Sequence, residues 1–230
     1  NEMCKIINKN QKKRNLIEIH NRPYLVKYIK NRIEDSLLTL FLHNDPLTMK
    51  GSKSIEERKE ILSIVSKVYC VSNFIKNKFL EGIDKNKSKV VVLYNGVERS
   101  LKKFPKKEKN IIFVGRIVED KGVHFYVDAI NNIYEHLKDW NFKIIGSPKP
   151  GDYLYKSKYS NEVLSKFENI GKRTHVLGFL NQKKLKYLFS KSSIIVIPSV
   201  WDEPFGLVAA EAMANGLAII SSKKGGLQEV

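Results

Sequence analysis

Short apolar runs alternate with longer amphipathic stretches along most of this 230-residue chain. Bounded apolar runs are typical of buried parallel strands, and apolar residues three and four apart are typical of helices. Strands are predicted at 16–19, 37–42, 68–71, 90–94, 110–114, 142–145, 175–177, 194–197 and 218–221. Helices are predicted near 54–66, 72–81, 123–137, 161–167, 182–190 and 205–215. This alternation predicts an α/β fold with parallel sheets.

The alternation occurs on both sides of residues 99–109, a lysine-rich segment that contains Pro105. Because such composition favours an exposed connection, we expect a linker there. Two doubly wound, Rossmann-like domains should then flank it, at residues 1–98 and 110–230. The chain starts with asparagine instead of methionine and ends where another helix should begin, so we interpret it as a fragment.

Two glutamates, Glu203 and Glu211, lie eight positions apart around the start of the helix predicted at 205–215. This helix follows the carboxyl end of a strand, where open α/β sheets bind ligands. The first backbone N–H groups of a helix have no partners within it, and the helix dipole adds partial positive charge there. Here these groups are predicted to be those of Phe205, Gly206 and Leu207. An anion site with carboxylates nearby suits a phosphorylated sugar.

A second loop, Gly115 to Gly122, follows the strand predicted at 110–114. It carries Arg116 and, five residues later, Lys121. Arginine offers a planar fork of donors to phosphate oxygens, and lysine offers a compact point charge. Two such cations at a strand's carboxyl end could hold a diphosphate and stabilise its departure without a metal.

Together the two segments resemble signatures of the retaining glycosyltransferases of family 4, within glycosyl transferases group 1, which have the GT-B fold. Pro198 to Gly216 contains the Glu-x7-Glu pattern in the context Glu-Pro-Phe-Gly-Leu, and Gly115 to Gly122 matches a Gly-Arg-x-x-x-x-Lys-Gly loop. Near the end, Gly225-Gly-Leu-Gln-Glu229 resembles the family's Gly-Gly-x-x-Glu turn. The first domain lacks the opening strand and glycine-rich loop that this fold leads us to expect, so it should be incomplete.

The resemblance implies transfer of a sugar from a nucleoside-diphosphate sugar to a hydroxyl of a glycan or lipid-linked acceptor. Configuration would be retained, and neither a metal nor another cofactor would be needed. Arg116 and Lys121 would hold the diphosphate, aided by the N–H groups at the helix start. Glu203 would contact the donor sugar in a catalytic role, and Glu211 the ribose.

A histidine is also expected at the reacting sugar. His43 follows an apolar strand and begins the sequence His-Asn-Asp-Pro. It can accept a proton near neutral pH, and family members place an important histidine on the corresponding strand. His20 ends an earlier strand in a similar way and remains the alternative. The His-Asn-Asp-Pro loop also resembles that of lipopolysaccharide and surface-polysaccharide enzymes.

The chain is strongly basic, with a formal net charge of +17. Residues 1–109 carry 25 lysines and arginines against 12 acidic residues, whereas residues 110–230 carry 16 against 12. The excess reflects either a lysine-rich coding bias or a first domain that docks on an anionic membrane or glycan. Nucleic-acid binding is not expected, because no aromatic-studded basic strand or recognition helix is visible.

The remaining composition indicates a cytoplasmic protein, peripheral on the membrane at most. No apolar stretch approaches the ~20 residues of a membrane-spanning helix, and no signal peptide is visible. The cysteines, Cys4 and Cys70, form no disulfide or metal pattern, and Cys70 should be buried.

Two alternatives stay open. One is another enzyme of the same fold, a phosphorylase or an epimerase, although the lysine motif of a pyridoxal-dependent phosphorylase is not found. The other is a fragment that binds a nucleotide sugar but lacks turnover.

Overall fold

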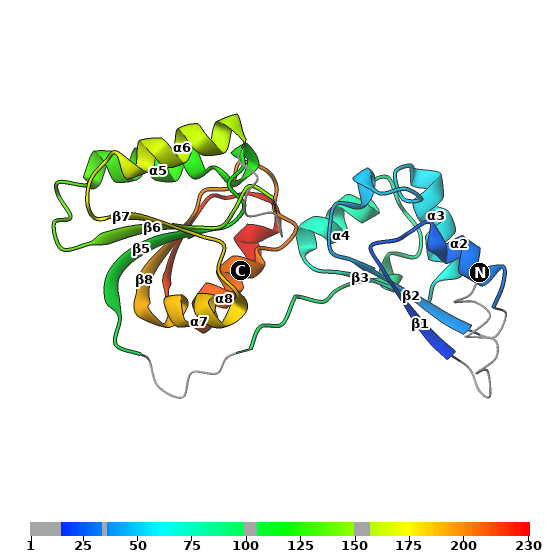
Figure 1. Ribbon diagram of the computed structural model, residues 1–230. Coiled ribbons are helices and arrows are strands. Elements are labelled where there is room, and N and C mark those ends of the chain that lie inside the picture. The colour runs from blue at the N-terminus through cyan, green and yellow to red at the C-terminus, as the bar shows by residue number, and fades with distance from the viewer. Residues whose placement is uncertain (1–14, 34–35, 99–104, 150–156) are drawn as a thin grey trace. The chain divides into compact units, whose positions relative to one another are not determined.

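The structure is a computed structural model that describes residues 15–33, 36–98, 105–149 and 157–230. These residues form two compact units, which divide between Asn95 and Gly96 (Figure 1). We call the first unit 1 and the second unit 2. Most of the predicted linker, residues 99–104, lies outside the described residues. Its last two residues, 108 and 109, belong instead to the first strand of unit 2.

Unit 1 is built on a four-stranded sheet in which every neighbouring pair is parallel. The order is β1-β2-β3-β4, with β1 Asn15–His20, β2 Ser36–Leu42, β3 Lys67–Cys70 and β4 Val90–Val92. The helices are α2 Leu25–Lys30, α3 Ile55–Ile64 and α4 Asn73–Leu80, with short 3-10 turns at Pro46–Thr48 and Lys87–Lys89. The sequence pattern did not predict α2, which at six residues is too short to show helical periodicity.

Side chains cap two helices of unit 1 as the sequence predicts. The Ser54 hydroxyl accepts a hydrogen bond from the Glu57 backbone, and the Glu57 carboxylate accepts one from the Ser54 N–H. This is the capping box that opens α3. Ser72 caps α4 by accepting from the N–H of Ile75. Cys70 is fully buried, and burial raises the pKa of its thiol to about 12.

Unit 2 is built on a five-stranded parallel sheet in the order β7-β6-β5-β8-β9. The strands are β5 Glu108–Val114, β6 Asn141–Ile145, β7 Thr174–Gly178, β8 Ser192–Ile197 and β9 Ala218–Ser221. The helices are α5 Val123–Ile133, α6 Lys158–Glu168, α7 Gln182–Lys191 and α8 Leu207–Ala214, with 3-10 turns at Glu119–Lys121 and Gly225–Glu229. The chain builds outward from β5 to β7 and then returns to place β8 on the other side of β5. The strand order therefore reverses between β5 and β8, and such a switch point is where open α/β sheets bind ligands.

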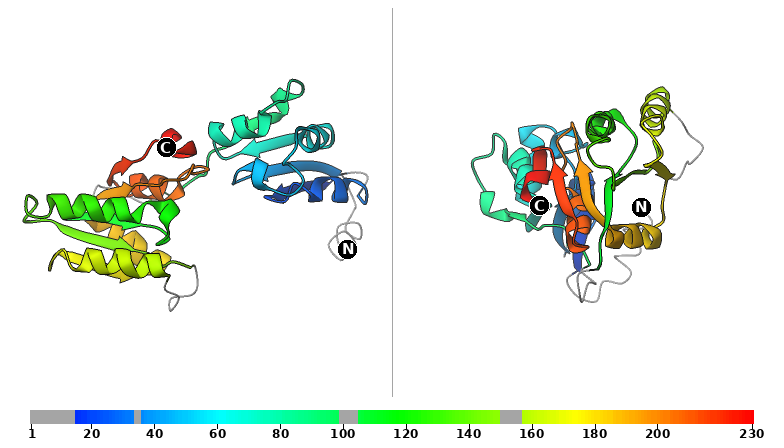
Figure 2. Two further views of the ribbon diagram at one scale, coloured as in Figure 1. Left: turned by 90° about the horizontal axis from the view of Figure 1, so that it is seen from above. Right: turned by 90° about the vertical axis from the view of Figure 1, so that its left-hand side faces the viewer.

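Two apolar clusters pack on the two faces of this sheet. One joins α5 and α6 to β5 and β6, with Phe113, Tyr126, Phe142 and Phe167 almost fully buried. The other joins α7 and α8 to β5 and β8. The two pairs of helices lie on opposite sides of the sheet in Figure 1, and Figure 2 shows α5 beside α6. Because helices cover both faces of the sheet, the apolar side chains on both sides of its inner strands are buried or half-buried, which explains the continuous apolar runs in the sequence.

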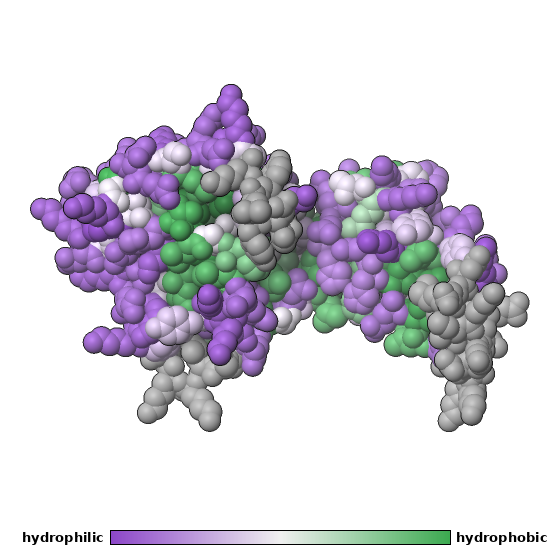
Figure 3. Space-filling model, in the orientation of Figure 1, coloured by the Kyte–Doolittle hydropathy of each residue, from purple (hydrophilic) through white to green (hydrophobic). Residues whose placement is uncertain are grey.

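Hydrophilic residues cover most of the surface drawn in Figure 3. Hydrophobic residues gather there on unit 2, around the edge strand β7. Leu177 and Phe179, at the end of this strand, are 40% and 49% exposed. These apolar side chains stand close to the carboxyl edge of the sheet.

Candidate active site

Two loops meet at the switch point of unit 2, residues 115–122 after β5 and residues 198–206 after β8. The N–H of Val200 donates to the carbonyl of Asp120 at 2.9 Å. Gly122 has a φ of +66°, and a Cβ added to it would lie 1.9 Å from the carbonyl oxygen of Pro198. The loops therefore pack backbone against backbone, and glycine is required at this contact.

The predicted start of the glutamate helix is wrong by two residues. Helix α8 begins at Leu207 instead of Phe205, because Gly206 precedes it with φ 108° and ψ 52°, outside helical geometry. Phe205 is a buried side chain, 7% exposed, and is not among the residues that line the hollow described below. The residues at the helix start that line this hollow are Gly206, Leu207, Val208 and Ala209.

Glu203 lies at the centre of a small polar network. Its Oε1 atom accepts from the Lys121 Nζ at 2.5 Å and from the Ser199 Oγ at 2.6 Å. Glu203 is 8% exposed and Ser199 is 2% exposed. The Lys121 ammonium also lies 5.0 Å from the ring centroid of Trp201, within range of a cation–π contact. The loop cation and the loop carboxylate that the sequence predicts separately are thus an ion pair in the folded chain.

Arg116 and this network line a hollow of about 360 Å³ at the carboxyl edge of β5 and β8. The start of α8 also lines this hollow, so that a helix start, an arginine and a lysine all border it. Arg116 is exposed. Within the residues described, its guanidinium makes no hydrogen bond or ion pair. Its five donors are therefore available to an anion.

Two smaller hollows adjoin the first. One, of about 170 Å³, shares Val114, Gly115 and Arg116 with it and has an apolar lining that includes Phe179 and Leu180. The other, of about 230 Å³, shares Leu207 with the first hollow. Leu185 lines both smaller hollows, so all three are contiguous. We call them the phosphate hollow, the apolar hollow and the Glu211 hollow.

Glu211 does not join Glu203 in the phosphate hollow but lines the hollow named after it. Burial raises the pKa of its carboxyl above the ordinary value, and the charge of nearby Lys186 partly opposes that rise. Lys186 itself pairs with Glu98 at 2.5 Å on the same hollow. The two glutamates of the motif therefore serve two neighbouring sites.

A glycine turn supports the Glu203 loop from behind. The N–H of Gly226 donates to the carbonyl of Glu203 at 2.6 Å. A Cβ on Gly225, whose φ is +54°, would lie 2.3 Å from that carbonyl oxygen. This gives a physical reason for glycine at position 225 of the turn predicted from the sequence.

In unit 1, the two candidate histidines form a pair. His20 Nδ1 and His43 Nε2 lie 3.0 Å apart, and the rings are stacked with centroids 5.3 Å apart. Asn21 joins the same strand ends, because its Oδ1 accepts from the His43 N–H at 2.8 Å. Sequence reasoning treated His20 and His43 as alternatives, whereas the fold makes them partners. Burial, and then the charge of His20, lower the pKa of His43 from its ordinary value of 6.5.

We expect the imidazole of His43 to titrate below pH 6.5. Because the folded chain disfavours the charged ring, unit 1 should lose stability as the pH falls from 6.5 through the folded pKa of His43. Replacing His20 with phenylalanine keeps a ring stacked on Phe41 but removes the charge. The midpoint of His43 should then rise while staying below 6.5, since burial remains. Imidazole NMR titration of both proteins measures this, and an unchanged midpoint in His20→Phe would contradict the electrostatic coupling.

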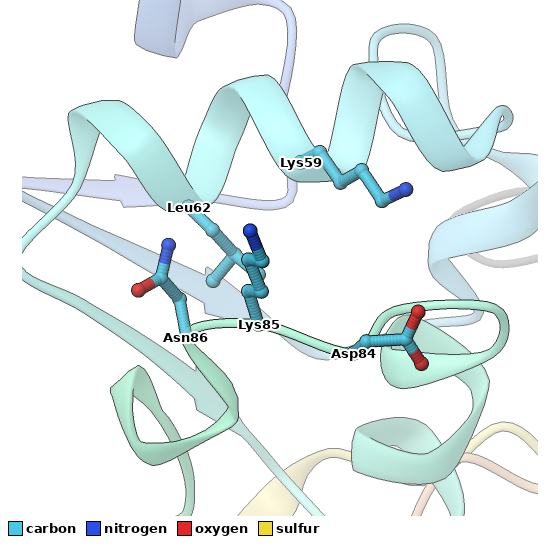
Figure 4. Close-up of a pocket in the computed structure, with 5 residues that line it drawn as sticks. All are labelled: Lys59, Leu62, Asp84, Lys85 and Asn86. Carbon is cyan, nitrogen blue, oxygen red and sulfur yellow. The ribbon is translucent and has the colours of Figure 1, made fainter.

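A separate hollow of about 360 Å³ lies in unit 1. Lys59 and Leu62 reach it from α3, and the segment after α4 contributes Asp84, Lys85 and Asn86 (Figure 4). Lys85 extends toward α3 in this view. Two lysines against one aspartate give the hollow a positive lining, in keeping with the basic composition of this part of the chain.

The described residues contain no cluster of three or more His, Cys, Asp or Glu side chains that could hold a metal ion. Nor does the described part of the chain include a helix with the length and apolarity needed to cross a membrane.

Comparison with known proteins identifies the family of unit 2. The sequence profile described as "Glycosyl transferases group 1" matches residues 97–230, more than half of the chain. The chain belongs to this family. The chain is 33% identical over 204 residues to an uncharacterized glycosyltransferase, MJ1178, of Methanocaldococcus jannaschii. The match covers 88% of the chain but 53% of that relative, so the chain spans about half of its length.

Solved structures show the same fold. A glycosyltransferase from Rickettsia africae superimposes with a TM-score of 0.77 over 99% of this chain and 62% of its own, at 22% identity. Anabaena Alr3699/HepE in complex with UDP gives a TM-score of 0.75 over 98% of this chain and 64% of its own, at 19% identity. The predicted α/β fold of GT-B type is confirmed.

The sequence patterns did not point to three residues that shape the site: Ser199, Trp201 and Gly146. Ser199 and Trp201 gave no signal, because a serine and a tryptophan in a loop have many ordinary roles. Gly146 was also missed, although a Cβ there would lie 1.7 Å from the carbonyl oxygen of Gly115. Its position directly after the strand predicted at 142–145 was the one available hint.

Proposed function

We propose that the phosphate, apolar and Glu211 hollows together bind a nucleoside-diphosphate sugar, and that the whole protein transfers its sugar to an acceptor hydroxyl. The observation that carries this proposal is their contiguity at the switch point of unit 2. One hollow combines two cations and a helix start with a buried carboxylate, one is apolar, and one carries a second carboxylate. A nucleotide sugar has parts that match these linings: a diphosphate, a base, and the hydroxyls of a sugar and a ribose.

The parts of the donor can be assigned by complementarity. The diphosphate would lie between Arg116, Lys121 and the N–H groups that open α8. The sugar hydroxyls would donate to Glu203, and the ribose hydroxyls to Glu211. The base would enter the apolar hollow, where Phe179 offers a face for stacking.

The chemistry we propose is electrostatic. When the bond from the anomeric carbon to the phosphate oxygen breaks, negative charge develops on the departing diphosphate. Arg116, Lys121 and the start of α8 would stabilise that charge. The acceptor oxygen would attack from the same face and pass its proton to the leaving phosphate, which retains configuration. Retention follows the resemblance to family 4, as does a role for His43 at the reacting sugar.

For the acceptor we propose a glycan or lipid-linked hydroxyl, at or near an anionic membrane surface on the cytoplasmic side. The support is the excess of lysine and arginine in residues 1–109. A cationic surface attracts anionic lipids or phosphorylated glycans through their charge. Vesicle sedimentation at low and high salt would test the membrane part separately from the donor site.

The donor site is tested by calorimetry of the chain with UDP, GDP and ADP, with and without EDTA. UDP is the first probe, since the Anabaena structure named above holds it. We expect one of the three nucleotides to bind at least tenfold more tightly than the others, with the same affinity in EDTA. If a chain shown to be folded by circular dichroism bound none of them, the proposal would fail. Binding that vanished in EDTA would contradict its metal-free form.

A panel of acceptors then separates an active transferase from a fragment that binds the donor without turnover. Release of the nucleoside diphosphate only in the presence of an acceptor would demonstrate transfer. Tight donor binding without release on any acceptor would favour the incomplete fragment.

A further inference from the structure

We infer that Ser199 is a positioning residue for Glu203: it holds one carboxylate oxygen so that the other faces the donor sugar. This rests on the proposed function, because it concerns the sugar end of the same site. None of the motif patterns in the sequence points to this serine.

Among the described residues, two protein donors converge on one oxygen of Glu203 and none on the other. Within the residues described, the hydrogen bonds from Ser199 and Lys121 both end on Oε1. Oε2 receives no protein donor there, while the side chain of Glu203 lines the phosphate hollow. An ionised carboxylate can accept at both oxygens. Because Oε1 already accepts two hydrogen bonds, Oε2 is the oxygen that can accept one from a hydroxyl in the hollow.

Ser199 and Lys121 should behave differently when a nucleotide sugar binds. Lys121 is the cation assigned to the diphosphate, so phosphate oxygens compete with Glu203 for its ammonium. Ser199 has no such competitor, because it is 2% exposed and carries no charge. Once Lys121 turns toward the diphosphate, Ser199 is the donor that keeps Oε1 in place. Its importance should therefore increase in the bound state.

The backbone around Ser199 is well suited to this task. The next residue, Val200, donates its N–H to the carbonyl of Asp120 at 2.9 Å. The backbone that follows β8 is thus tied to the loop that carries Lys121. A side chain with a single rotor on so firm a backbone costs little entropy to order.

The experiment compares Ser199→Ala and Ser199→Cys with the unsubstituted chain and with Ser222→Ala. Cysteine nearly preserves the shape of serine but is a weak donor, so it separates the hydrogen bond from the packing. Ser222→Ala removes a neighbouring hydroxyl that bonds to the backbone of Ser199 and not to Glu203. Each protein is titrated with UDP and with UDP-glucose, and the ratio of the two dissociation constants reports the contribution of the sugar.

We expect Ser199→Ala and Ser199→Cys to weaken UDP-glucose binding about tenfold while changing UDP binding less than twofold. Ser222→Ala should leave the ratio unchanged. Crystal structures of the variants with UDP bound should show the Glu203 carboxylate rotated or spread over two rotamers in Ser199→Ala and ordered in Ser222→Ala.

Three outcomes would overturn the inference. They are a Glu203 carboxylate that stays in place in Ser199→Ala, equal losses for UDP and UDP-glucose, and a Ser199→Cys variant indistinguishable from the unsubstituted chain. Failure of the proposed function looks different. The unsubstituted chain would then bind none of UDP, GDP and ADP, a result that does not depend on Ser199.

Discussion

Replacing Arg116 with alanine should weaken binding of UDP by about 100-fold, or about 3 kcal/mol. The guanidinium lines the phosphate hollow, is exposed, and has no protein partner within the described residues. Its removal therefore costs the diphosphate two charge-assisted hydrogen bonds without breaking contacts that hold the fold. Calorimetry with UDP measures the loss, and thermal melting should show an unchanged midpoint.

Two matched variants sharpen this prediction. Arg116→Lys keeps the charge but loses the planar fork, so it should lose about tenfold in affinity. Lys172→Ala removes an exposed cation of unit 2 that lines none of the three hollows, and should change affinity less than twofold. Equal losses of UDP affinity in Arg116→Ala and Lys172→Ala would mean that binding depends only on the overall positive charge of the chain.

Gly122→Ala should destabilise unit 2 by about 3 kcal/mol or more. The added Cβ would lie 1.9 Å from the Pro198 carbonyl oxygen, so either the loop after β5 or the loop after β8 must move. A left-handed φ of +66° adds strain of about 1–2 kcal/mol for any residue with a Cβ. Because both loops carry proposed donor-binding residues, UDP binding should fall with stability. Urea denaturation followed by tryptophan fluorescence measures the stability of unit 2, since both tryptophans, Trp140 and Trp201, belong to it.

Gly178→Ala is the control for this substitution. Gly178 also has a left-handed φ, +63°, but a Cβ there would have no neighbour within 4 Å. It should therefore show the conformational strain alone, about 1–2 kcal/mol. If Gly122→Ala and Gly178→Ala cost the same, the close approach of the two loops would not hold in solution.

Much of this architecture is predictable because it is local. Buried parallel strands require continuous apolar runs, and every predicted strand is present with bounds that differ by at most two residues. Ser54 and Ser72 cap helices because their partners lie three residues along the chain. The start of α8 was placed two residues early, because a glycine before a helix does not reveal from sequence that it will adopt a left-handed conformation.

The sequence by itself determined the α/β class and the family, and it supplied the candidate residues of the site, since each depends on residue types at short spacing. Only the tertiary structure decided which of them meet. Lys121 pairs with Glu203 across 82 positions of sequence, and Ser199 donates to the same carboxylate oxygen. Glu211 lines a different hollow. The fold also joins His20 to His43, which sequence treated as rivals. These contacts arise from strand order, which brings the ends of strands distant in the chain to one edge of a sheet, and no local pattern encodes that order.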